Sequence, residues 1–347
     1  MPVAIATAPT TDRIVPFTAG DGMELNLIHV TNGGAPTKGP VLLVHGAGVR
    51  ANIFRAPVRA TLVDLLLEAG YDVWMENWRA SIDLPANRWS LDQAALFDHP
   101  YAVRKIVEET GVSEVKAVIH CQGSTSFMMS AVAGLVPEVT TIVSNAVSLH
   151  PVVPWAAGIK HRVAVPVVAR LTPYLNPQWG LNPGNLFEKS LTAFVKLTHH
   201  ECDNIVCRMS SFTYGVGFPT LWRHENLNAE THDWLVREFS NVPLTFFKQI
   251  GLSLRAGHLV PMDHPDKLPA SFVAQPPKTT ARFAFFAGEE NRCFTYESQV
   301  KTHAWFDGHD PGRHTLHVIP GYAHLDIFMG KDAGRDVLPK IVEELDR

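Results

Sequence analysis

The residues around Cys121 have the types and spacing of a nucleophilic acylation site. An apolar run, residues 115–120, leads directly into Cys121, Gln122 and Gly123, and a helix-like stretch, residues 124–133, follows. A strand that breaks into a helix at a glycine-containing turn is typical of a nucleophile elbow, which lifts the central side chain above the sheet. We therefore expect the thiol of Cys121 to attack a carbonyl carbon.

Two regions later in the chain supply candidate partners for this thiol. His324 lies in a short loop after the apolar run 315–320 and is the candidate base. Another apolar run, residues 281–287, is followed by Glu290 and Asn291, where a residue that orients the histidine is expected. The chain order is therefore nucleophile, orienting residue, histidine.

Asn291 is the preferred candidate for orienting His324. A thiol, with an ordinary pKa of about 8.5, ionises far more easily than a hydroxyl. An amide oxygen can then suffice to fix the tautomer of the imidazole, as in the Cys-His-Asn arrangement of papain-like proteases. Glu290, Glu289 and Asp326 are the alternative carboxylates, and Asn291 also fits an ordinary turn composition.

An apolar run near the N-terminus, residues 40–44, supplies a second backbone donor. It ends in His45, Gly46 and Ala47. We expect the backbone N–H groups of Ala47 and Gln122 to bind the oxyanion of the tetrahedral intermediate. His45, like the histidine that precedes Cys121, is expected to pack and hold its loop without transferring a proton.

Taken together, these motifs resemble the α/β-hydrolase superfamily of lipases and esterases, whose catalytic triad has the same chain order. Residues 70–79 resemble a strand-end motif of the acid lipases, and residues 120–124 and 320–328 resemble a bacterial hydrolase group also found fused to cholesterol-oxidase-like proteins. The resemblance implies an α/β fold with a mostly parallel, doubly wound sheet and an inserted helical cap. It also implies hydrolysis of a carboxylic ester, thioester or lactone through a covalent acyl-enzyme.

Two departures from the hydrolase pattern keep other functions open. Ile119 stands where the usual elbow has glycine, and Asn291 stands where an aspartate is usual. The cysteine elbow, with Trp78 and Asp92 upstream of it, also resembles polyhydroxyalkanoate synthases, which are acyltransferases. A non-catalytic, small-molecule-binding protein of the hydrolase fold is the third hypothesis.

The spacing of apolar runs predicts how the chain is organised. Further strands are expected at residues 41–45, 71–75 and 139–144, an entry hairpin at 14–17 and 25–30, and helices at 98–111 and 337–345. The alternation of strands and helices is lost from residue 149 to residue 275, where prolines and aromatic residues are frequent. We therefore expect a hydrolase core of residues 1–148 and 276–347, with residues 149–275 as a helical cap over an apolar acyl pocket.

Composition narrows the class of protein. The 347 residues carry a net charge of −4 without a polybasic run, so nucleic acid is not an expected partner. The sequence has no apolar run of the ~18 residues that a membrane helix needs, and residues 1–11 do not resemble a signal peptide. The expectation is a cytoplasmic enzyme that needs no cofactor and acts on a small, apolar acyl substrate.

One segment of the expected cap carries side chains that can bind metals. His199, His200, Glu201 and Asp203 surround Cys202, and Cys207 follows. Zinc sites in sequences usually show two recognisable ligand pairs, and only one pair is visible here. We therefore expect no metal and two reduced, packed thiols.

Overall fold

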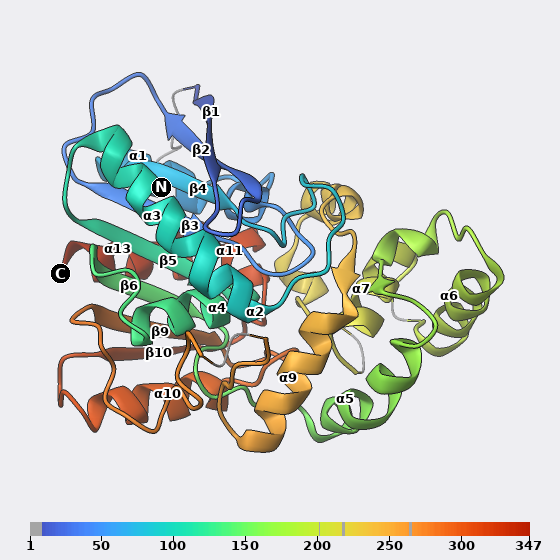
Figure 1. Cartoon of the computed structure of the whole chain (residues 1–347). Coiled ribbons are helices and arrows are strands. Elements are labelled where there is room, and N and C mark those ends of the chain that lie inside the picture. Colours follow the sequence, from blue (N-terminus) through green and yellow to red (C-terminus); the bar gives the residue numbers. More distant parts are fainter. Residues whose placement is uncertain (1–8, 201, 217–218, 264–265) are drawn as a thin grey trace.

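An eight-stranded sheet forms the centre of the protein (Figure 1). The computed structural model describes residues 9–200, 202–216, 219–263 and 266–347. The strands lie in the order β1-β2-β4-β3-β5-β6-β9-β10, and every neighbouring pair from β4 to β10 is parallel. Their bounds are β1 Thr11–Thr18, β2 Glu24–Thr31, β3 Pro40–Val44, β4 Asp72–Asn77, β5 Val115–His120, β6 Val139–Asn145, β9 Arg282–Gly288 and β10 Thr315–Ile319. The mostly parallel sheet predicted from the sequence is confirmed.

Antiparallel pairing is confined to one edge of the sheet. β1 pairs with β2 and β2 with β4 in antiparallel register, which is the expected entry hairpin. The central strands β3 and β5 are almost entirely buried, because helices cover both faces of a parallel sheet and leave no strand face for water. Their continuous apolar runs, without alternation, follow from this burial.

Helices flank the sheet, with α3 on the viewer's side in Figure 1 and α13 behind it. The longer helices are α1 Leu62–Glu68, α3 His99–Thr110, α4 Cys121–Val132, α5 Trp155–Val168, α6 Leu186–Thr198, α7 Ile205–Tyr214, α9 Leu244–Ala256, α10 Glu297–Asp307 and α13 Leu338–Asp346. The short ones are α2 Leu91–Gln93, α8 Ala229–Trp234, α11 Asp326–Met329 and α12 Ala333–Asp336. Single turns of tighter or wider helix occupy Ala51–Arg55, Ala94–Asp98, Pro177–Gly180, His224–Asn226 and Leu235–Arg237.

The helix boundaries follow the sequence signals. Pro100 lies in the first turn of α3, and Gly111 ends that helix with a left-handed φ of 71°, which a residue without Cβ adopts at little cost. α13 likewise has its proline in the first turn. No helix in the described parts of the chain is long and apolar enough to span a membrane.

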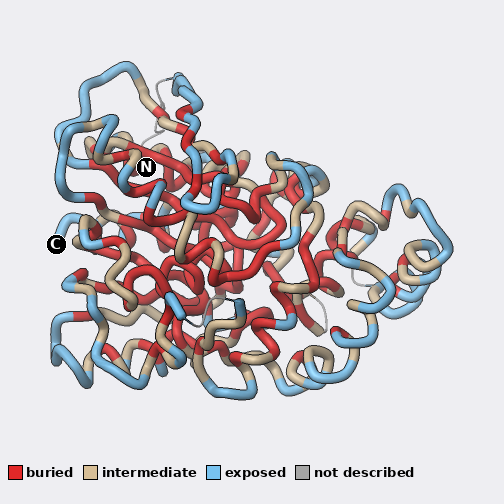
Figure 2. The backbone as a smooth tube through the Cα atoms, viewed as in Figure 1, coloured by how far each residue is buried: buried red, intermediate tan, exposed pale blue. Residues whose placement is uncertain are grey.

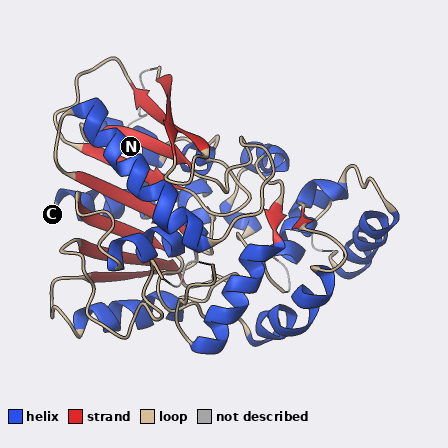
Figure 3. Ribbon diagram, viewed as in Figure 1, coloured by secondary structure: helices blue, strands red, loops and turns tan. Residues whose placement is uncertain are grey.

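The chain between β6 and β9 is helical and extends to one side of the sheet (Figure 3). It contains α5 to α9 and a two-stranded ribbon of β7 Tyr174–Leu175 and β8 Val242–Pro243. Figure 2 shows the buried backbone concentrated in the sheet and more exposed chain toward the outer helices of this segment. The segment follows β6, and the prediction that it forms a cap is taken up under the proposed function.

A buried carboxylate fastens the end of this segment to the core. Asp92 in α2 is fully buried and accepts the backbone N–H groups of Met262 and Asp263, each at 2.6 Å. Gln249 of α9 donates its side-chain amide to the same carboxylate and accepts the N–H of Leu91. Three donors from the segment therefore depend on one core side chain.

Replacing this carboxylate should loosen the segment. Asp92→Ala leaves buried N–H donors without an acceptor, which should lower the free energy of unfolding by roughly 3 kcal/mol. Urea unfolding monitored by circular dichroism measures the change. The control is Asp263→Ala, because the Asp263 side chain is exposed and only its backbone contacts Asp92. Equal stability of the two variants would contradict the anchoring role of Asp92.

Candidate active site

Cys121 lies at the junction of β5 and α4 in a strained backbone conformation. Its φ is 55°, one of two positive values among the described residues other than glycine. A left-handed conformation is costly for a residue with a Cβ, and such strain is found preferentially at functional sites. The sequence indicated that this helix begins at residue 124, but α4 begins at Cys121 itself. The expected elbow is therefore present, with Cys121 at its apex.

Two glycines allow the elbow to pack against the loop after β3. A Cβ on Gly123 would lie 2.2 Å from the carbonyl oxygen of His45, and a Cβ on Gly46 would lie 2.9 Å from the Cβ of Cys121. Any larger residue would push the two segments apart. Ile119, where the usual elbow has a third glycine, is fully buried in β5, and the elbow forms nevertheless.

The two predicted oxyanion donors lie beside the thiol. The backbone N–H groups of Ala47 and Gln122 act as hydrogen-bond donors that lower the pKa of Cys121. These hydrogen bonds favour the thiolate, but burial outweighs them and raises the pKa of the Cys121 thiol to about 12. An oxyanion formed beside the sulfur would find the same two donors within reach.

His324 lies beside the thiol. Sγ of Cys121 and one ring nitrogen each of His120 and His324 all lie within 4.8 Å of one another. His324 is 1% exposed, and burial lowers its pKa to about 3. At neutral pH both the thiol and the imidazole are therefore uncharged, and the resting site holds no thiolate–imidazolium pair.

Asn291 contacts His324 through its amide nitrogen. Nδ2 lies 3.1 Å from Nδ1 of His324. The amide oxygen, which we expected to face the ring, instead accepts the backbone N–H groups of Cys293 at 3.0 Å and Phe294 at 3.2 Å. Turning the amide over would set its two N–H bonds against these donors, so its orientation is fixed. Nδ1 must then accept, and the neutral ring carries its proton on Nε2.

None of the alternative carboxylates reaches the histidine. Glu290 is largely exposed, and its carboxylate lies 3.9 Å from the guanidinium of Arg223. Asp326 accepts the N–H groups of Ala323 and Arg223 and an amide N–H of Asn226, and burial raises its pKa to about 6. Glu289 is exposed. Within the described residues, the only hydrogen-bond partner of the His324 ring is Asn291.

The neighbouring histidines hold loops, as the sequence analysis expected. Nδ1 of His45 donates to the carbonyl oxygen of Gly46 at 2.7 Å. Nδ1 of His120 accepts from the amide of Asn145 at 2.9 Å. Burial lowers the pKa of both rings, that of His45 to about 3. These two polar rings therefore add no charge to the site.

A second array of serine, histidine and carboxylate lies behind the elbow. Nδ1 of His99 donates to Glu76 at 2.9 Å, and its Nε2 lies 2.7 Å from Oγ of Ser126. All three side chains are fully buried, and Ser126 also lies 2.9 Å from the carbonyl oxygen of Gln122. Because no substrate can reach it, we interpret this array as a polar support for the first turn of α4.

A narrow pocket with mainly apolar walls opens onto Cys121. Its walls come largely from the segment between β6 and β9, including His161 of α5, Tyr214 of α7, and Phe247 and Ile250 of α9. Sequence reasoning missed Tyr214, whose hydroxyl donates to the carbonyl oxygen of Ala47 at 2.8 Å. This contact joins the segment to the loop after β3, and no local sequence pattern predicts it.

A strained cysteine between strand and helix, two N–H groups beside its thiol and a histidine in a late loop are the arrangement typical of a hydrolase fold. A model of the alpha/beta hydrolase fold family matches residues 39–331, and the chain belongs to this family.

Curated relatives and solved structures agree with this placement. Over 133 residues the chain is 26% identical to sterol esterase 2 of Saccharomyces cerevisiae (strain ATCC 204508 / S288c), covering 32% of this chain and 25% of that protein. Over 227 residues it is 27% identical to human lipase member K, covering 56% of this chain and 54% of that protein. The chain thus spans from a quarter to about half of these two relatives.

The fold is also that of a soluble variant of monoglyceride lipase from Saccharomyces cerevisiae, solved in complex with a substrate analogue. The TM-score is 0.60 at 14% identity, over all of this chain and 98% of that one. This likeness confirms the α/β-hydrolase fold expected from the sequence.

The neutral resting state makes the reactivity of Cys121 depend on pH in a defined way. Only the thiolate is alkylated, so with a thiol pKa of about 12 the rate with iodoacetamide should rise about ten-fold per pH unit between about pH 7 and pH 10. Peptide mass spectrometry separates Cys121 from the other thiols. A rate that is already at a plateau near neutral pH, and that falls in His324→Ala, would instead reveal an ion pair.

Proposed function

We propose that the protein is an acyl hydrolase that cleaves a carboxylic ester, thioester or lactone through a covalent intermediate on Cys121. The observation that carries the proposal is the convergence of three groups on one sulfur: the N–H groups of Ala47 and Gln122 and the ring of His324. The names of the relatives, a sterol esterase and a lipase, support an ester as the substrate class.

The first half of the reaction acylates the sulfur. Sγ of Cys121 attacks the carbonyl carbon while its proton passes to Nε2 of His324, and the N–H groups of Ala47 and Gln122 bind the oxyanion. Collapse of the tetrahedral intermediate breaks the bond to the alcohol or thiol, which leaves with the proton held by His324. In the second half, His324 takes a proton from water, and the resulting attack releases the acid and restores the thiol.

The hydrogen bond from Asn291 to His324 adds to the free-energy cost of this cycle. The resting tautomer of His324 carries its proton on Nε2, whereas a base must present a lone pair there. Moving the proton to Nδ1 sets it against the amide N–H of Asn291 and costs about one buried hydrogen bond, roughly 1–3 kcal/mol. A cysteine, which loses its proton more easily than a serine, tolerates a weaker base.

An apolar acyl group fits the surroundings of Cys121. Aromatic and aliphatic side chains dominate the pocket walls, as they do in sites that bind apolar ligands. We propose that residues 149–275 act as the cap that forms these walls. One face of α5 lines the cavity through His161, and the other carries an exposed apolar stripe at four-residue spacing: Trp155, Ile159, Val163 and Val167.

Acyl transfer is the second candidate function. Its support is that no carboxylate assists His324 among the described residues, which weakens activation of water in the deacylation half. An acyl-enzyme with a slow hydrolytic step can pass its acyl group to a better nucleophile such as an alcohol. The two functions share Cys121, His324 and the oxyanion donors and differ only in the acceptor.

Intact-protein mass spectrometry tests the proposed chemistry. Mixing the protein with an activated short-chain acyl ester or thioester should add the mass of one acyl group to wild type and none to Cys121→Ala. The matched control is Cys293→Ala, which removes another buried thiol of the same cavity and should still acylate.

The fate of the adduct separates the candidate functions. Decay in water indicates a hydrolase, whereas decay only after an alcohol is added indicates a transferase. No adduct and no turnover with varied acyl groups would overturn the proposal in favour of a non-catalytic binding protein.

Restoring a carboxylate at Asn291 should raise activity. In Asn291→Asp, one carboxylate oxygen can keep the N–H groups of Cys293 and Phe294 while the other accepts Nδ1–H of His324 and favours the reactive tautomer. Since a carboxylate-to-amide exchange in a serine protease triad costs about 10⁴-fold in kcat, we expect a gain of at least about 100-fold when Asn291→Asp is added to Cys121→Ser.

The measurement is kcat/KM for a chromogenic short-chain ester, with Glu290→Gln as the control. Glu290 makes no contact with His324 in the structure, so its variant should match wild type. A large loss in Glu290→Gln, or no gain from Asn291→Asp, would contradict the assigned orientation of the histidine.

A further inference from the structure

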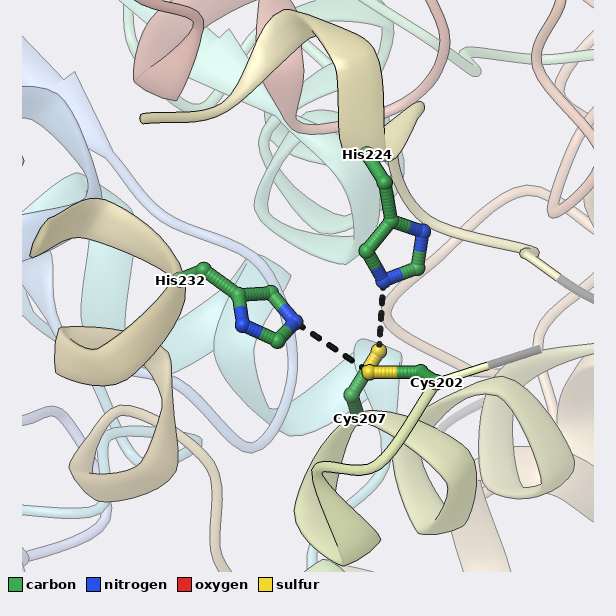
Figure 4. Close-up of side chains that lie close together, drawn as sticks. All are labelled: Cys202, Cys207, His224 and His232. Carbon is green, nitrogen blue, oxygen red and sulfur yellow. Dashed lines mark hydrogen bonds between the residues drawn. The ribbon is translucent and has the colours of Figure 1, made fainter. Parts of the chain in front are cut away.

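Four side chains with metal-ligand chemistry converge at one point of the segment between β6 and β9 (Figure 4). Cys202 precedes α7, Cys207 lies in the first turn of α7, His224 begins the short turn His224–Asn226, and His232 lies in α8. Their two sulfurs and one ring nitrogen from each histidine all lie within 4.8 Å of one another. Figure 4 shows both imidazole rings directed at the paired sulfurs.

The distances within the cluster fit a tetrahedral ion. Sγ of Cys202 lies 3.4 Å from Nε2 of His232, and Sγ of Cys207 lies 3.4 Å from Nε2 of His224. With metal–sulfur and metal–nitrogen distances of about 2.3 and 2.0 Å, the sulfur and nitrogen ligands of a tetrahedral zinc ion lie about 3.5 Å apart. The two sulfur–nitrogen distances of the cluster are therefore close to those around a bound ion.

The local backbone holds the two thiols in place. The side chain of Asn204 caps α7 by accepting the N–H groups of Val206 and Cys207, and its own backbone N–H lies 3.3 Å from Sγ of Cys202. A backbone N–H donated to sulfur favours the thiolate, which is the form that binds metal. Both cysteines are free of disulfides.

We propose that Cys202, Cys207, His224 and His232 bind one Zn²⁺ ion in a structural site. Two thiolates and two imidazoles in tetrahedral arrangement are a donor set typical of zinc. Two thiolate charges also balance the charge of the ion, so the partly buried site stays neutral. All four coordination positions are filled by protein, as in structural rather than catalytic zinc sites.

Such an ion would join the two parts of the segment that contact the active site. Cys207 shares α7 with Tyr214, which bonds the loop after β3 at Ala47. His224 lies two residues before Asn226, whose side chain donates to the carbonyl oxygen of Gly321 in the loop that carries His324. The ion would therefore fix helix α7 against the histidine loop without touching the reacting atoms.

The sequence did not predict this site because its ligands come from separate elements. Sixteen residues separate Cys207 from His224, and seven separate the two histidines, whereas the second pair in common zinc motifs is separated by three to five residues. Of the candidates named beside the cysteines, His199, His200 and Asp203 stay outside the cluster, and Glu201 lies outside the described residues.

Metal analysis of the untagged, full-length protein tests the proposal. The Cys121→Ala background removes the sulfur of the neighbouring cluster with His120 and His324, so that a metal bound there is not counted. Elemental mass spectrometry should find about one zinc ion per chain in protein purified from a zinc-containing medium. Adding Cys207→Ser or His232→Asn should reduce the zinc to near zero, whereas the control His200→Gln should retain it.

Cobalt reports the geometry without any ligand variant. Protein stripped by a chelator and loaded with Co²⁺ should show the visible bands of a tetrahedral ion and a near-ultraviolet sulfur-to-cobalt band, and zinc should bleach both. Absence of stoichiometric zinc, octahedral cobalt spectra, iron in place of zinc, or equal zinc in the ligand variants would each overturn the proposal. If the protein binds zinc but forms no acyl adduct, the zinc proposal stands and only the proposed hydrolase function fails.

Discussion

The arrangement of the site depends on the left-handed backbone of Cys121. With φ at 55°, the chain leaves β5 and enters α4 at once, and the N–H groups of Ala47 and Gln122 act on the thiol. That geometry requires the loop after β3 to approach α4 so closely that a Cβ on Gly123 would collide with the backbone at His45. The strain at one residue is held by the parallel sheet and by this close contact.

Burial without charge is the second property of the site. Within the described part of the chain, neither Cys121 nor His324 has a charged partner that offsets its desolvation, so burial moves both pKa values toward the neutral forms. A serine in this setting would need a carboxylate to stabilise the imidazolium. The chain instead has a cysteine, whose side chain is intrinsically more acidic than that of serine, and an amide at Asn291 whose oxygen already accepts two backbone N–H groups. Cysteine and asparagine thus form a consistent pair, although the amide faces the ring with its nitrogen.

The sequence predicted what depends on local pattern. Apolar runs located the strands of the sheet, the glycine-containing turn located the elbow at Cys121, and the loop position located His324. It could not predict which end of the Asn291 amide faces the ring, because backbone N–H groups two and three residues later decide that. Nor could it predict Tyr214 against Ala47, a contact across 167 residues that forms only once the helical segment folds onto the core.

The cluster of Cys202, Cys207, His224 and His232 could not be predicted for the same reason, because its ligands meet only after the helical segment has folded. Cys202 lies just before α7, and the other three ligands lie on α7, on a single tight turn and on the six residues of α8. Each of these elements is shorter than the ~12–15 residues that an isolated helix needs to be stable, so a metal cross-link at this point would stabilise their arrangement. Because α7 carries Cys207 at one end and Tyr214 at the other, a bound ion and the loop after β3 would act on the same rigid helix. The position of one wall of the pocket beside Cys121 would then be set from both ends of α7.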